Sequence, residues 1–190
     1  MVTKQRKTKE TDISISLKLD GSGKSAIDSG VGFLDHMLES FSKHSLIDLD
    51  IKCKGDTHID DHHSVEDIGI VLGSLIAEAL YPVKNMERFG SANIVMDEAC
   101  VSCDIDLSNR PFLVYEIDID GKVGNFDTEL VEEFFRAFVL NSRITAHLVQ
   151  LRGKNKHHII EATFKAMAVA IRRATTRNDK VGIPSTKDVL

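Results

Sequence analysis

The feature that most constrains the fold is an internal repeat. The segment Lys43–Gly55 (KHSLIDLDIKCKG) matches Asn141–Gly153 (NSRITAHLVQLRG) at an offset of 98 residues. In both copies the shared final glycine precedes a pair of adjacent histidines, and these two pairs lie 95 residues apart. Self-similarity at a fixed spacing is typical of duplicated structural units. The repeat therefore predicts a fold built from two equivalent halves.

The order of apolar patterns supports this division. Alternation predicts strands, and apolar residues three and four apart predict helices. In the first half the patterns predict a β-hairpin with strand Ile13–Leu19 and a return segment to Asp28, a helix over 33–41, a strand over 46–53 and a helix over 62–80. In the second half they predict strands over 92–96, 100–107 and 112–119, a helix over 128–140, a strand over 144–151 and a helix over 157–175. We expect an α/β (α+β) fold with halves at residues 1–85 and 86–190, each a mostly antiparallel sheet backed by two helices, together one compact domain.

Charge and hydropathy narrow the classes of partner. The chain has 24 Lys and Arg against 29 Asp and Glu, so its formal net charge of −5 offers no global field for nucleic acid or an anionic membrane. No apolar run approaches the roughly 20 residues that span a bilayer. Met1–Glu10 is polar and basic and lacks the apolar core of a secretory signal. These features predict a cytoplasmic protein that holds any anionic ligand in a local basic pocket.

Two short motifs imitate functional sites. Cys100-Val-Ser-Cys103 lies in an alternating strand pattern, where residues i and i+3 face opposite sides, so a shared metal or redox centre is not expected. Gly21-Ser-Gly-Lys-Ser25 resembles the end of a phosphate-binding loop, but Lys18 stands where that motif needs glycine and no helix pattern follows. We interpret the second motif as a turn.

The histidines form a pattern with chemical meaning. Each half carries His-His-x-x-Glu at the start of a predicted helix, with His62, His63 and Glu66 in the first and His157, His158 and Glu161 in the second. Residues three or four apart share a helix face, so each glutamate can bind a metal together with one histidine of its pair. Adjacent helical residues diverge by about 100°. The repeat therefore predicts two metal ions, each with ligands from both halves.

Two further histidines complete a candidate ligand set. Adding His36 and His147 gives eight nitrogen or carboxylate ligands, or four for each of the two ions. An octahedral ion then keeps about two positions for water or substrate, which indicates a catalytic site. Imidazoles and carboxylates without thiolate suit Mn²⁺, Fe²⁺ or Co²⁺ as well as Zn²⁺. By pattern alone, His36 and His147 could equally be buried structural histidines.

A series of motifs along nearly the whole chain resembles the imidazoleglycerol-phosphate dehydratase family of histidine biosynthesis. The motifs are, in order, Thr8–Thr11, Leu19–Gly21, Gly32–Leu38, Asp60–Asp67, Arg88–Gly90, Met96–Ala99, Asp106–Pro111, Gly153–His158 with Glu161, and Pro184–Lys187. Two departures are small. Asn109 stands where the family usually has glycine, and Asp188 replaces the glycine that usually follows Ser-Thr-Lys.

The resemblance implies an activity and an assembly. The reaction is dehydration of D-erythro-imidazoleglycerol phosphate to imidazole acetol phosphate by a hydro-lyase that uses two Mn²⁺ ions. The implied ligands are His36, His62, His63, Glu66, His147, His157, His158 and Glu161. The family also implies a 24-mer assembled from trimers, with active sites completed across subunit contacts.

The resemblance also assigns residues outside the ligand set. Glu10, in the Thr-Lys-Glu-Thr motif, becomes the candidate acid/base, because proton transfer at the reacting carbon needs a positioned carboxylate. The candidate phosphate-binding residues are Arg88, Arg110, Lys187 and Ser185. Two alternatives use the same ligands: a dinuclear hydrolase that activates water, and a non-catalytic assembly held together by metal.

Overall fold

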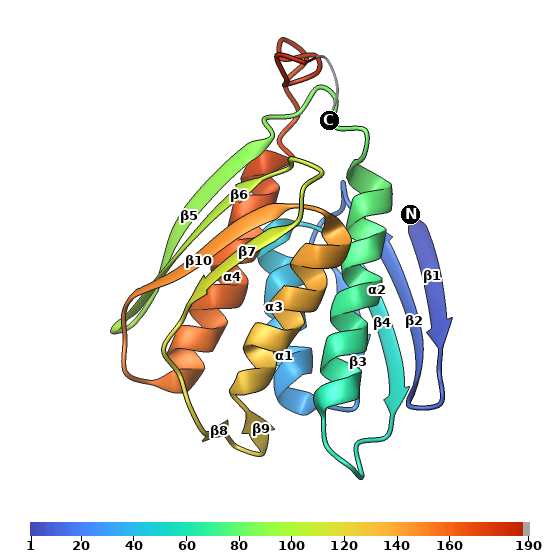
Figure 1. Ribbon diagram of the computed structural model, residues 1–190, viewed down its shortest axis with the longest axis vertical. Coiled ribbons are helices and arrows are strands. Elements are labelled where there is room, and N and C mark those ends of the chain that lie inside the picture. Colours follow the sequence, from blue (N-terminus) through green and yellow to red (C-terminus); the bar gives the residue numbers. More distant parts are fainter. Residues whose placement is uncertain (188–190) are drawn as a thin grey trace.

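The computed structural model describes residues 1–187 and consists of three layers. Four helices lie between two four-stranded sheets (Figure 1). The helices of the described chain are α1 (Gly32–Ser45), α2 (His62–Leu80), α3 (Glu129–Ser142) and α4 (Lys156–Ala174). The strands are β1 (Val2–Lys7), β2 (Thr11–Lys18), β3 (Ser25–Asp28), β4 (Asp48–Gly55), β5 (Phe89–Met96), β6 (Ala99–Asp106), β7 (Phe112–Glu116), β8 (Lys122–Val123), β9 (Phe126–Asp127) and β10 (Thr145–Arg152).

The two sheets repeat one topology. The first has the order β1-β2-β4-β3 and the second β5-β6-β10-β7. In each sheet the first two neighbouring pairs are antiparallel, and the last pair, β3 with β4 or β7 with β10, is parallel. Each half also supplies two helices, in the same order along the chain. The predicted fold of duplicated, mostly antiparallel halves is confirmed.

The helical layer joins the two halves. Helix α2 packs against α3, and α1 packs against α4, so each helix pair combines one helix from each half. Gly69 and Gly73 of α2 face α3 closely: a Cβ at these positions would lie 2.8 Å and 2.5 Å from carbonyl oxygens of that helix. Buried phenylalanines of α3 and α4 fill the space beside this contact. The boundary between residues 85 and 86 stays a prediction.

Most predicted elements are present, with two errors in the first half. Ile13–Leu19 and the segment to Asp28 do not form a hairpin, because β2 pairs with β1 and β4, while β3 pairs in parallel with β4. The polar start of the chain forms β1, an edge strand that the alternation criterion missed. Edge strands need only one partner and tolerate charged side chains, which explains its composition. The short β8–β9 hairpin was also missed.

Both imitations of functional motifs are explained by local structure. A strand, β3, follows the glycine-rich turn, and Oδ1 of Asp48 accepts hydrogen bonds from the Ser22 and Lys24 amides at 2.7 and 3.0 Å. A carboxylate thus satisfies amides that would hold phosphate in a true P-loop. On β6, Cys100 pairs with exposed Val95 and Cys103 with a buried alanine, as expected for opposite faces.

Two helix ends share an uncommon backbone conformation. Leu46 follows α1 with φ of 62°, and Arg143 follows α3 with φ of 57°. Glycine is the usual residue in this left-handed region. Asn109 also lies there, with φ of 56°. Asparagine tolerates this conformation better than most residues, so it can stand where the related family has glycine. Asp188, the other departure, lies outside the described residues.

Candidate active site

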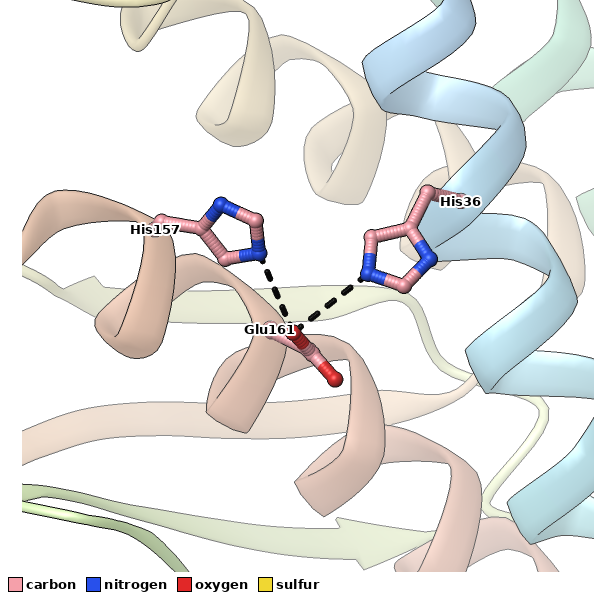
Figure 2. A group of neighbouring side chains, drawn as sticks. All are labelled: His36, His157 and Glu161. Atoms are coloured by element: carbon pink, nitrogen blue, oxygen red, sulfur yellow. Dashed lines mark hydrogen bonds and ion pairs between the residues drawn. The ribbon is translucent and has the colours of Figure 1, made fainter.

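Three of the eight predicted ligands meet between α1 and α4. His36 comes from the first half, and His157 and Glu161 come from the second (Figure 2). The Nε2 atoms of the two histidines lie 3.5 and 3.2 Å from Oε2 of Glu161. Among residues 1–187, this is the one group of three or more candidate ligands within mutual reach. The expectation that a cluster draws on both halves fits this geometry.

The start of α4 orients the cluster. The Asn155 side chain caps the helix by accepting hydrogen bonds from the amides of His157 and His158. Helical spacing then puts His157 and Glu161 on one face, one turn apart. The His157 and Phe33 rings pack nearly perpendicular to each other, with centroids 5.2 Å apart. Capping and packing thus orient the His157 ring toward Glu161.

Lys165 is a site residue that the sequence analysis missed. Its Nζ lies 2.7 Å from Oε1 of Glu161, one helical turn away, which leaves Oε2 to face the two histidines. Burial raises the pKa of Glu161, but the hydrogen bond and charge of Lys165, together with His36 and His157, outweigh it and lower the pKa overall. The i, i+4 spacing of Glu161 and Lys165 was the available signal.

The first half presents its ligands on α2. His62 Nε2 lies 3.8 Å from Oε2 of Glu66, so His62 is the histidine of the pair that lies beside this glutamate. His63 faces another way: its Nδ1 lies 3.0 Å from Asp56, and its Nε2 lies 3.8 Å from Glu10. The hydrogen bond to Asp56 raises the pKa of His63. Because a carboxylate only accepts, Nδ1 donates, and Nε2 of the neutral ring has a free lone pair for a metal.

His158 repeats this arrangement in the second half. Its Nδ1 donates to Oε2 of Glu98 at 2.8 Å, and its Nε2 lies 3.8 Å from Asp97. The His158 hydrogen bond and the amides of Asn155 and Lys154 lower the pKa of Glu98 to about 2. That bond in turn raises the pKa of His158. Glu98 lies in the β5–β6 turn, the counterpart of the β1–β2 loop that carries Glu10.

His147 lies apart from these groups. It is exposed on β10, in register with Asp104 of β6 and Val114 of β7. The alternation of β10 puts its buried neighbours Ala146 and Leu148 on the core face, so His147 projects from the outer face of the sheet. The described chain therefore brings together three of the predicted ligands, keeps His62 and Glu66 as a separate pair, and holds His63, His147 and His158 apart from both groups.

The four predicted phosphate-binding residues line one cavity. Arg88, Arg110, Ser185 and Lys187 surround a space of about 550 Å³ with Ser108, Pro184 and Thr186. The Arg88 side chain is 14% exposed; its guanidinium forms a forked pair with Asp106 at 2.6 and 3.0 Å and donates to the Pro184 carbonyl. The Arg110 side chain is 73% exposed, and its guanidinium lies 4.0 Å from the Asp106 carboxylate. Arg88 thus shapes the cavity, and Arg110 is the more available cation.

The cavity and the histidine cluster lie at opposite ends of α4. His157 stands in its first turn, whereas Ala174, its last residue, accepts a hydrogen bond from the amide of cavity residue Arg88. A rise of 1.5 Å per residue puts these helix positions about 26 Å apart. In Figure 1 the segment after α4 lies at the top and the start of α4 near the bottom. One chain therefore does not bring its two candidate subsites together.

Comparison with known proteins gives the family. A sequence model described as imidazoleglycerol-phosphate dehydratase matches residues 29–171, which is well over half of the chain. The chain belongs to the imidazoleglycerol-phosphate dehydratase family. Family membership makes it an enzyme of the hydro-lyase class, as the motifs predicted. No helix within residues 1–187 is both long and apolar enough to cross a membrane.

Relatives and solved dehydratase structures agree with this result. A Sulfurimonas denitrificans imidazoleglycerol-phosphate dehydratase is 79% identical over 190 residues, which are all of both chains. A Campylobacter concisus dehydratase is 66% identical, with 97% of this chain and 95% of that protein covered. The Staphylococcus aureus enzyme structure has a TM-score of 0.83 at 45% identity and covers 94% of this chain and 100% of its own. The Pyrococcus furiosus enzyme, in complex with (S)-C348, has a TM-score of 0.85 at 38% identity and covers 98% and 100%.

Proposed function

We propose that the chain catalyses metal-dependent dehydration of D-erythro-imidazoleglycerol phosphate to imidazole acetol phosphate in histidine biosynthesis. The observation that carries the proposal is the convergence of His36, His157 and Glu161 from two helices. Imidazole and carboxylate donors at this spacing suit a catalytic cation and an imidazole-bearing substrate. A separate cavity with cationic side chains suits the phosphate at the other end of that substrate.

The donor set fits a divalent cation. One atom from each of the three residues lies within 4.8 Å of the others, and no thiolate is among them. We propose that these residues hold one of two Mn²⁺ ions, or Fe²⁺, Co²⁺ or Zn²⁺ in its place, and that both sites are completed by His62, His63, Glu66, His147 and His158. When bound, a cation would lower the pKa of the substrate's imidazole ring and so favour departure of the neighbouring hydroxyl.

Glu10 is the proposed acid/base. The reaction removes a hydrogen from the carbon next to the one that loses hydroxide, and the resulting enol becomes a ketone by gaining a proton at the carbon attached to the ring. Glu10 is about half-exposed, and its carboxylate lies 3.8 Å from Nε2 of His63. It can therefore face a substrate ring while staying next to His63, a candidate metal ligand, which is the position that a proton-transfer group needs.

The phosphate would be held by the cavity at the far end of α4. Arg110, Lys187 and Ser185 line it and supply two cations and a neutral donor. Arg88 has its guanidinium committed to Asp106 and the Pro184 carbonyl, so its main contribution is to hold the loop that carries Ser185 and Lys187. A forked arginine pair gives such a loop a defined position.

The separation of the two subsites supports an assembly with shared active sites. Five bonds of roughly 1.5 Å separate the substrate's ring from its phosphorus, a span far shorter than the distance along α4. We propose that the histidine cluster of one copy meets the phosphate cavity of another, in a cytoplasmic homo-oligomer that is a 24-mer. Closed symmetric assembly gives every copy the same completed sites.

The direct test uses the metal-stripped protein and imidazoleglycerol phosphate, with and without added Mn²⁺. We expect the ketone product to form only after the metal is restored. Release of inorganic phosphate in place of ketone would favour the dinuclear hydrolase. Metal-dependent assembly without any product would favour a non-catalytic role for the ions.

A further inference from the structure

A set of hydrogen bonds links the β1–β2 loop, which carries Glu10, to one turn of α2. We infer that Asp67 is a positioning residue that fixes Glu10 relative to His63. The inference rests on the proposed function, in which Glu10 is the acid/base. Neither the ligand pattern nor the predicted phosphate residues include Asp67, and its carboxylate contacts Thr11 and Arg6.

The Asp67 carboxylate holds both ends of the loop. Asp67 is 6% exposed. Its Oδ2 accepts a hydrogen bond of 2.5 Å from Oγ1 of Thr11, the first residue of β2, and forms an ion pair with Arg6 near the end of β1. Thr11 is itself 3% exposed, so this contact is shielded from water. One carboxylate thereby fixes the residues on either side of the Glu10 loop.

The loop between these contacts is also fixed. Oγ1 of Thr8 accepts hydrogen bonds from the amides of Glu10 and Thr11, at 3.1 and 3.0 Å. The Glu10 carbonyl accepts from the amide of Asp56 at 3.1 Å. The carboxylate of Asp56 then binds Nδ1 of His63. Every main-chain polar group of Glu10 thus has a partner within this small network.

The network closes on α2. His63 and Asp67 are four residues apart and share a face of the helix. One end of the loop is therefore held at Asp67, while the Glu10 carboxylate stands 3.8 Å from Nε2 of His63, one turn earlier. The distance between the acid/base and a candidate metal ligand depends on where Asp67 holds Thr11.

The ion pair between half-buried Arg6 and buried Asp67 is better explained by geometry than by stability. Replacing a buried ion pair with apolar side chains of similar volume is often neutral or stabilising. The directional bonds of a carboxylate, in contrast, select one register of the loop against the helix. Catalysis is sensitive to such placement, since a shift of about 1 Å can reduce the rate about 100-fold.

The test removes one contact at a time in the full-length protein. Thr11→Val keeps the side-chain shape and loses the hydroxyl, and Arg6→Met keeps the aliphatic stem and loses the charge. We expect each variant to lower kcat about 10- to 100-fold, with KM and metal content unchanged. Thr11→Ser should restore most of the rate. The matched control is Thr3→Val, which removes an exposed hydroxyl of β1 that contacts Ser16, and its kcat should stay at the wild-type value.

Two further measurements separate positioning from general damage. In a Glu10→Gln background, Thr11→Val should cause no further loss of kcat, because the group it positions is already gone. In the absence of substrate, amide exchange of Asp56 should rise in Thr11→Val, while exchange in the core of α2 stays slow. Variants at full rate in an active enzyme would overturn the inference, as would an equal further loss in the Glu10→Gln background. An inactive wild-type protein would instead overturn the proposed function.

Discussion

Two inactive variants should restore each other's activity if active sites are shared between copies. The first variant, His157→Ala, loses a ligand of the histidine cluster, and the second, Arg110→Ala, loses a cation of the phosphate cavity. The cluster and the cavity are separated by about 26 Å along α4, so one substrate does not reach both in the same chain. In the proposed shared-site arrangement, an active site needs an intact cluster from one copy and an intact cavity from another.

The expected recovery follows from random mixing. With equal amounts of both variants, half of the clusters and half of the cavities are intact, so about one quarter of the sites in a symmetric oligomer have both. The assay is Mn²⁺-dependent ketone formation after the two variants are co-expressed, or unfolded and refolded together. His36→Ala mixed with His157→Ala is the control, and it should stay inactive because both changes damage the same cluster. No recovery in the first mixture, with oligomers of normal size, would refute the shared-site reasoning.

Three further predictions concern stability and the cavity. Gly73→Ala puts a methyl group 2.5 Å from a carbonyl oxygen of α3. We expect the free energy of unfolding, measured with urea, to fall by about 1–3 kcal/mol. The control is Gly32→Ala, which places its methyl group with no atom within 4 Å and should leave stability nearly unchanged. Burial and nearby cations lower the pKa of His44 from 6.5 in the folded protein, so protonation of His44 favours the unfolded chain. Relative to His44→Gln, the wild type should therefore lose thermal stability as the pH falls below 6.5. Arg88→Lys breaks the forked pair and frees the Pro184 loop. KM should rise about tenfold, equivalent to about 1.4 kcal/mol. An unchanged KM would contradict the role assigned to Arg88.

The sequence predicted the helices well because each has a continuous apolar face. The predicted helix over 62–80 corresponds to α2 at His62–Leu80, and the one over 157–175 to α4 at Lys156–Ala174. The strand pairing was less accessible. Ile13–Leu19 was given the wrong neighbour because alternation identifies a strand and its buried face, but not the strand beside it. Val2–Lys7 was missed because an edge strand with four charged or amide side chains has little apolar signal.

The site was predicted in part for similar reasons. Helical spacing left either histidine of each pair as the neighbour of its glutamate, and the structure puts Glu161 beside His157 and Glu66 beside His62, four residues away in each case. The same spacing gave no information on Asp56, which approaches His63 from the end of β4. Contacts of this kind depend on how strands and helices are stacked, and a periodic pattern does not encode them.

The left-handed residues after α1 and α3 have a consequence for tolerance to heat. An L-amino acid in this conformation costs about 1–2 kcal/mol, and glycine avoids that cost while losing about 0.5–1 kcal/mol in chain entropy. Leu46 is 42% exposed, so Leu46→Gly gives up little packing and should raise the melting temperature. Arg143→Gly should gain less, since the Arg143 guanidinium stacks 4.7 Å from the centre of the Tyr81 ring. The same strained turn occurs in both halves, and Leu46 is the position where thermostability can be improved without altering any predicted site residue.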